Sequence, residues 1–158
     1  MQLLIEVLPF VSEENCFALK GGMAINMFVR DMPRLSVDID LMHLLIEKGG
    51  VRIKIKASPV MRGTVREVSL RIVSSNVEEE FGFVETPVVH PDDLYAGKLC
   101  ATLDRQHPRD FFDVRGLLDN EGISDDLMNV FIVYLISSNQ PIAKVLSPST
   151  GHTCFDGL

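Results

Sequence analysis

The chain has 158 residues, of which 46% are hydrophobic and 23% charged, a composition that excludes a disordered polar chain and suits one domain with a buried core. The formal net charge of −7 excludes binding of nucleic acid through overall positive charge, so RNA would need a local basic patch. Three widely spaced cysteines, Cys16, Cys100 and Cys154, indicate neither a disulfide framework nor a zinc site. Because the N-terminus has no basic leader and no long apolar run, we expect a cytoplasmic protein without a membrane span.

The N-terminal part is predicted to begin with a helix over residues 2–8 that Pro9 ends. An apolar strand, Cys16–Leu19, then leads into the pair Gly21-Gly22. From Met23 to Arg30 the apolar residues recur at helical spacing, so a short helix is expected there. A helix that begins at such a pair offers free backbone N–H groups and the positive end of its dipole, which suits phosphate.

The segment Ser36–Leu41 alternates as a strand does, which places Asp38 and Asp40 on the same face. Two neighbouring carboxylates can share a divalent cation. Combined with the Gly-Gly helix start, this pair predicts phosphoryl or nucleotidyl transfer. Each part also has an ordinary explanation, since most Asp-x-Asp pairs lie on solvated strand faces and most Gly-Gly pairs are turns.

A Gly-Gly pair at 49–50 predicts an antiparallel hairpin whose second strand covers residues 51–57. In that register Lys48 pairs with the first residue of the second strand. Lys56 then falls opposite His43 unless a bulge shifts the pairing.

The rest of the chain predicts two more strands followed by helices. The strands cover residues 64–73 and 83–89, and a polar loop over 74–80 connects them. The helices are expected from Pro91 to about Asp104, from Asp110 to Leu118 with Asp110 as its cap, from Asp125 to about Ser137 with Ser124 as its cap, and briefly after Pro141. We therefore predict an α+β fold, with a small mixed β-sheet core in residues 1–90 and a helical C-terminal region with a loose tail in residues 91–158.

Five stretches of the sequence carry a family resemblance. Residues 17–26 and 34–41 resemble the first motif of the DNA polymerase β-like nucleotidyltransferases. Residues 60–64, 93–101 and 104–114 narrow the resemblance to the AbiEii/AbiGii toxin family, the toxin half of type IV toxin–antitoxin and abortive infection systems. It extends over nearly the whole chain, to about Leu146.

The resemblance implies a polymerase β-like nucleotidyltransferase that uses Mg²⁺ or Mn²⁺ and a nucleoside triphosphate, with an acceptor that is RNA for some members and a cognate antitoxin as a possible partner. Carried over by position, Asp38 and Asp40 would ligate the metal and act in catalysis. The nucleotide-binding residues would be Gly21, Gly22, Lys98, Asp110 and Asp113.

The residues alone leave alternatives open for the positions in the helical region. Lys98 is equally well explained as a solvated lysine on a helix, and Asp110 as a helix cap. Arg109 and Arg115 are either surface charges or the local basic patch that RNA would need.

Two departures from the family pattern suggest a shortened member. Lys56 occupies the position where the family has a third carboxylate, and only residues 42–50 connect strands that the family joins through a helical segment. Two functions follow. One is a nucleotidyltransferase-fold toxin homologue whose catalysis is weakened or lost, and the other is a non-catalytic module of the same fold that binds a protein such as an antitoxin. A metal-dependent phosphohydrolase is less favoured, because it does not need the Gly-Gly helix start.

Overall fold

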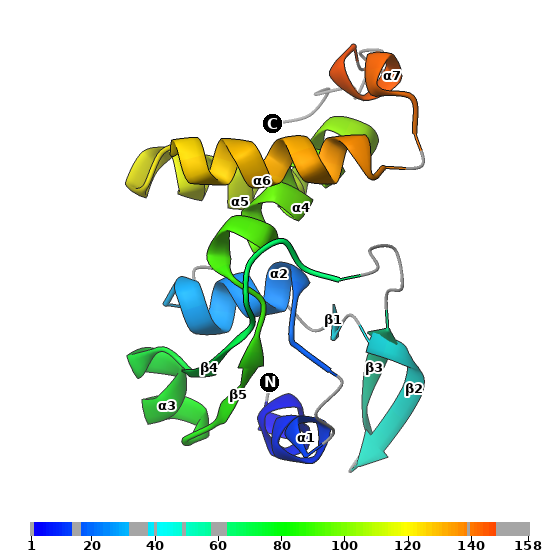
Figure 1. Cartoon of the computed structure of the whole chain (residues 1–158). Helices are drawn as coiled ribbons and strands as arrows, with labels where there is room; N and C mark the ends of the chain where they lie inside the picture. Colours follow the sequence, from blue (N-terminus) through cyan, green and yellow to red (C-terminus); the bar gives the residue numbers. More distant parts are fainter. Residues whose placement is uncertain are drawn as a thin grey trace, which may run out of the picture.

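A computed structural model describes residues 2–13, 17–31, 38–39, 41–48, 50–57, 63–138 and 140–147, and for 38–39, 41–48 and 51–57 it describes the backbone alone. The predicted α+β fold is confirmed. Helices α4 to α7 lie together at one end of the molecule, and the short strands lie at the other end, around α1 and α2 (Figure 1).

Helix α1 (Gln2–Ser12) extends beyond the predicted end, because Pro9 lies inside it. A proline removes one backbone N–H donor, but the carbonyl of Pro9 still accepts bonds from Glu13 N at 3.2 Å and Ser12 Oγ at 2.7 Å. Leu4 and Leu8 of this helix are fully buried. The apolar face of α1 therefore determines its length, and Pro9 does not end it.

The helix expected from Met23 begins two residues earlier, as α2 (Gly21–Ala24), and continues as a π-helix, η1 (Ile25–Val29). Gly21 has a φ of +83°, a conformation that favours glycine. Met23 and Met27 have no solvent exposure, so this short helical unit is part of the hydrophobic core.

Strands β1 (Asp38–Ile39), β2 (Leu41–Lys48) and β3 (Val51–Ala57) form a mixed sheet in the order β1-β3-β2. The predicted hairpin is confirmed, with Lys48 opposite Val51. The register shifts between Leu41 and Leu44, which leaves Leu41 opposite Ala57. The expected pairing of Lys56 with His43 falls in this irregularity and is not among the observed pairs. Residues 42–48 thus form a hairpin strand, in place of a helical connection.

A second sheet pairs β4 (Ser69–Ile72) with β5 (Glu85–Val88) in antiparallel register. Leu19 bridges to Val88 on the other side of β5, through bonds from Leu19 N to Pro87 O at 2.8 Å and from Val89 N to Leu19 O at 3.0 Å. The predicted strand that ends at Leu19 is therefore seen only as a bridge to β5, and among the described residues it does not pair with β1 or β3. Both observed strands are also shorter than predicted.

Helix α3 (Ser75–Phe81) replaces the polar loop that the sequence predicted between β4 and β5. Its glutamates favour helix, and Val77 is completely buried beneath them. Val77 and Phe81 are the only apolar residues of α3, and two such residues are too weak a pattern to recognise in the sequence.

The C-terminal region contains α4 (Pro91–Arg105), α5 (Pro108–Asn120), α6 (Asp125–Ile136) and α7 (Ile142–Leu146). Helix α4 is central, because it contacts α2 on one side and α5, α6 and α7 on the others (Figure 1). A single apolar cluster runs from α1 through α2 and β5 to α4 and α6. None of the described helices combines the length and the hydropathy that crossing a bilayer requires.

Candidate functional site

The Gly21-Gly22 pair starts helix α2 at the centre of the molecule. Lys20 before it is extended, with φ −140° and ψ 179°, and the positive φ of Gly21 turns the chain into the helix. Asn26 Nδ2 donates to the Gly22 carbonyl one turn later. The Asn26 Oδ1 atom is buried and has no hydrogen-bond partner among the described residues.

Helix α2 contacts both β1, which contains Asp38, and α4, which contains Lys98 (Figure 1). Segments that lie far apart in the sequence therefore meet at helix α2. The backbone of Asp38 pairs in register with Lys54 of β3. Asp40 lies outside the described residues, and the side chain of Asp38 is not described, so their predicted metal ligation stays a prediction.

Lys98, Asp110 and Asp113 lie together between α4 and α5. Lys98 Nζ is 3.0 Å from Asp110 Oδ1 and 3.0 Å from Asp113 Oδ2. The lysine is only 8% exposed and Asp110 only 2%. The alternative of a solvated Lys98 is therefore wrong, and the three positions that the resemblance grouped are in direct contact.

Arg105, at the end of α4, adds a second cation to this cluster. Its Nε donates to Asp110 Oδ2 at 2.6 Å and its Nη2 to Asp110 Oδ1 at 3.1 Å. Burial opposes ionisation of Asp110, but the hydrogen bonds from Arg105 and Lys98 outweigh it and hold the pKa of Asp110 below its ordinary value. These two cations and two carboxylates thus belong to one charge-assisted network.

Asp110 does not cap α5, which corrects the structural alternative for this residue. The cap is His107, whose Nδ1 accepts from Arg109 N at 3.2 Å, and Asp110 lies in the first turn. Arg115 is exposed and pairs with Asp119 one turn later at 3.3 Å. Its charge is neutralised locally, which weakens the case for an RNA-binding patch that includes it.

Asp38 and Asp40 fit a divalent cation by the chemistry of their donors, because carboxylate oxygens are the ligands that Mg²⁺ prefers. Within the described part of the chain, no group of three or more His, Cys, Asp or Glu side chains could hold a metal ion. A metal at this site would therefore depend on residues whose side chains are not described.

Two polar residues that the sequence analysis did not single out connect the elements around this region. Arg30, at the end of η1, donates from Nε to the Tyr95 hydroxyl at 3.0 Å and from Nη2 to the Gly116 carbonyl at 2.7 Å, and it pairs with Glu121. It thereby joins the Gly-Gly helical unit to α4 and α5. The sequence shows only an arginine after an apolar helix, which is an ordinary surface pattern.

The second such residue is Asp93, which is 2% exposed. Its carboxylate accepts from Val65 N at 2.7 Å, Arg66 N at 2.9 Å and the Tyr134 hydroxyl at 2.9 Å. An acid in the first turn of a helix is usually explained by the helix dipole. Here it also fixes the segment before β4 against α4 and α6, which no local pattern indicates.

Comparison with known proteins agrees with the resemblance found in the motifs. The family described as nucleotidyl transferase AbiEii toxin, type IV TA system, matches residues 2–50 and 42–152. The two matched stretches overlap at residues 42–50, where the hairpin replaces a longer connection, as expected of a shortened member. Neither a curated protein nor a solved structure is significantly similar to the chain. The chain belongs to the AbiEii nucleotidyltransferase toxin family of type IV toxin–antitoxin systems.

Proposed function

We propose that the protein transfers a nucleotide from a nucleoside triphosphate to an acceptor, with cytoplasmic RNA as the candidate acceptor. The observation that carries the proposal is the position of α2, which begins at Gly21-Gly22 and contacts both the strand of Asp38 and the helix of Lys98. The segments that carry the phosphate-binding and metal-binding candidates thus contact one short helix.

Each candidate residue has a distinct role in this proposal. The backbone N–H groups at Gly21 and Gly22 hold phosphate oxygens. Lys98 contributes positive charge from α4, and Asp110 and Asp113 fix the orientation of its side chain. Asp38 and Asp40 would hold Mg²⁺ or Mn²⁺, which when bound supplies stabilisation of negative charge on the phosphates.

We further propose that the activity is weaker than a complete site would give. Lys56 lies on β3, where the family has a carboxylate, and one lost electrostatic element commonly costs about a hundred- to a thousandfold in rate. The lysine at position 56, together with the shortened connection over 42–50, favours a second candidate function. In that alternative the chain has no catalysis and binds a protein partner such as its antitoxin.

Transfer of labelled nucleotide to total cellular RNA, in the presence of Mg²⁺, tests the proposal. Wild type should label RNA slowly, while Asp38→Asn and Asp40→Asn should abolish labelling because the metal loses a ligand. Asp119→Asn is the matched control, since its carboxylate is exposed on α5 and, among the described residues, pairs with Arg115 alone. Labelling that Asp38→Asn leaves unchanged would contradict the site assignment. No labelling by wild type, with retained binding of the antitoxin, would favour the alternative function.

A further inference from the structure

We propose that strand β4 is the contact surface of a homodimer, in which two copies of β4 pair antiparallel and join their sheets into one. This inference is independent of the proposed enzymatic function. It rests on the direction of the backbone groups of β4, on the exposure of its side chains and on its charge pattern.

The first observation is a free strand edge. Val73 N donates to Val84 O at 3.1 Å, so odd-numbered residues of β4 direct their backbone groups toward β5. Backbone groups alternate along a strand, so the N–H and C=O groups of Leu70 and Ile72 point to the opposite edge. The backbone groups of Leu70 and Ile72 on that edge make no hydrogen bond with any other described segment, and the free stretch ends at Ser74, whose N–H donates to Met27 O at 2.7 Å. Unpaired edges of this kind template pairing with another strand.

The second observation is an exposed apolar row on the same strand. Leu70 is 65% exposed and Ile72 is 49% exposed, and Val68 continues the row two residues before Leu70. Ser69 and Arg71 lie on the other face, opposite the buried residues Val88 and Thr86 of β5. A surface that combines free hydrogen-bonding groups with large apolar side chains is typical of an interaction site.

The third observation identifies a second copy as the occupant. Glu67 and Arg71 lie two residues before and two residues after Ser69. A two-fold axis through Ser69, normal to the sheet, places Glu67 of each copy opposite Arg71 of the other. It also places Val68 of each copy opposite Leu70 of the other, at positions whose N–H and C=O groups bond across the edge. Residues 67–71 are therefore complementary to themselves in charge and in apolar side chains, while Ile72 falls opposite Arg66.

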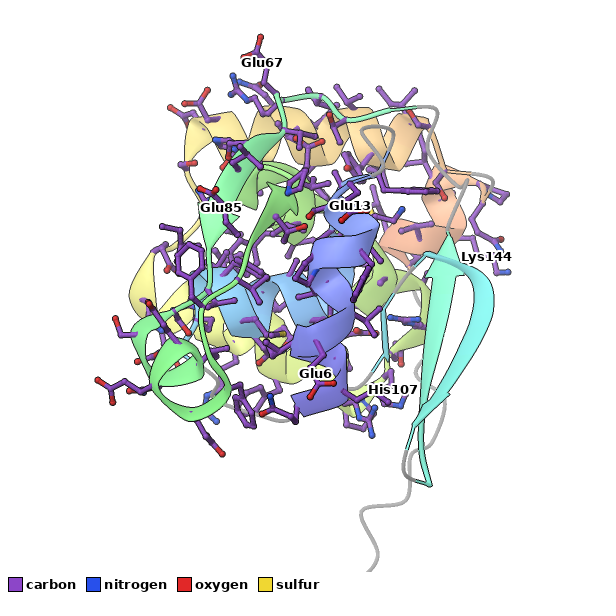
Figure 2. All side chains as sticks on the ribbon, turned by 90° about the horizontal axis from the view of Figure 1, so that it is seen from below. Glu6, Glu13, Glu67, Glu85, His107 and Lys144 are labelled. Atoms are coloured by element: carbon purple, nitrogen blue, oxygen red, sulfur yellow. The ribbon has the colours of Figure 1, made fainter. Side chains whose placement is uncertain are left out.

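Neither Glu67 nor Arg71 makes an ion pair with another described residue, so both are available to a partner. Figure 2 shows Glu67 projecting outward from the segment that leads into β4. This segment is already fixed, because Asp93 accepts the N–H groups of Val65 and Arg66, and Arg66 pairs with Asp126 at 2.6 Å. A pre-organised edge loses little conformational entropy on association.

Sedimentation equilibrium of the full chain tests the dimer through charge reversal. Wild type should be a dimer, and Glu67→Arg or Arg71→Glu alone should weaken it about tenfold or more, because each creates two repulsive pairs. The double variant Glu67→Arg/Arg71→Glu should restore association, since the pairs are attractive again. Glu85→Arg is the matched control, because it reverses an exposed charge on β5, the strand that does not form the new edge (Figure 2). Circular dichroism of each variant identifies any that fail to fold.

Cross-linking tests the register independently of charge. The Ser69 residues of the two copies face each other on the two-fold axis. They form a non-hydrogen-bonded pair with closely spaced Cβ atoms, which suits a disulfide. Under mild oxidation Ser69→Cys should give a covalent dimer in high yield, and wild type and Leu70→Cys should not. A wild type that remains monomeric at high concentration would overturn the proposal. So would charge reversals that leave dimerisation unchanged, or a cross-link at position 70 in place of position 69.

Discussion

Lys98 is a buried cation that lies between two carboxylates of α5. Replacement by methionine keeps its volume but leaves Asp113 without this cation and Asp110 with Arg105 alone. We expect Lys98→Met to lower the free energy of unfolding by about 3–5 kcal/mol, the usual cost of breaking a buried pair. Urea denaturation followed by circular dichroism measures the change.

The control for this prediction is Lys144→Met on α7. The Lys144 ammonium is exposed (Figure 2) and, within the described part of the chain, bonds to Gln140 Oε1 alone at 3.1 Å, so its loss should change stability by no more than about 0.5 kcal/mol. If the two variants unfold at the same urea concentration, the cluster around Lys98 contributes nothing to stability.

Asp110 should make stability depend on pH in the acid range. Its pKa is lower in the folded chain than in the unfolded chain, so its contribution is fully present above the unfolded value of about 3.9. That contribution is lost as the pH falls through the lower, folded pKa. We therefore expect wild type to lose stability below about pH 4 more steeply than Asp110→Asn.

Urea denaturation at a series of acid pH values gives the slope of the unfolding free energy against pH for wild type and for Asp110→Asn. Asp119→Asn, an exposed carboxyl on the same helix, should retain the wild-type slope. Equal slopes for wild type and Asp110→Asn would show that the Lys98 and Arg105 bonds do not favour the ionised form.

Among the helices, α6 has the clearest start signal. Ser124 Oγ accepts from Leu127 N at 3.1 Å, which satisfies one of the free N–H groups of the first turn. We expect Ser124→Ala to lower the free energy of unfolding by about 1 kcal/mol. Ser137→Ala at the other end of the helix should change it little, and a similar loss in both variants would mean that the cap is not the cause. Thermal unfolding of the two variants provides the comparison.

The elements that the sequence predicted well are those with local signals. Helix α4 begins at Pro91 as expected, and α6 begins at Asp125 after its cap Ser124, because a cap and its first turn are only a few residues apart. The wrong predictions are those that depend on contacts between segments far apart in the sequence. Pro9 is tolerated in α1 because the helix is anchored by Leu4 and Leu8, and that burial depends on segments far along the chain.

The same distinction applies to the sheets and to the candidate site. Leu19 pairs with Val88, about half the chain away, and nothing within the strand itself selects that partner. The contact of Lys98 with Asp110 and Asp113 agrees with a grouping that came from family motifs, whereas helix periodicity allowed Lys98 to be solvated. Arg105 and Asp93 were missed, because their partners become neighbours only when the helices pack.

At the scale of the whole molecule, the predicted division at residue 90 separates segments that share one apolar core. Leu4 and Met23 precede the division, Leu94 and Val130 follow it, and all belong to the same buried cluster. A shared core makes unfolding cooperative across the division. We propose that residues 1–90 and 91–158 are regions of one folding unit.

Arg30 links the two regions, so the proposal can be tested by expressing them as separate polypeptides. Its guanidinium group, from the first region, binds the Tyr95 hydroxyl and the Gly116 carbonyl of the second. Expressed as separate polypeptides, the two regions should each be poorly folded alone, yet reassemble when co-expressed, as in split-reporter complementation. Arg30→Met in the first polypeptide should reduce the recovered complex, while Arg71→Met, outside this bridge, should not. A gene interrupted at codon 90 would then encode two products that fold only together.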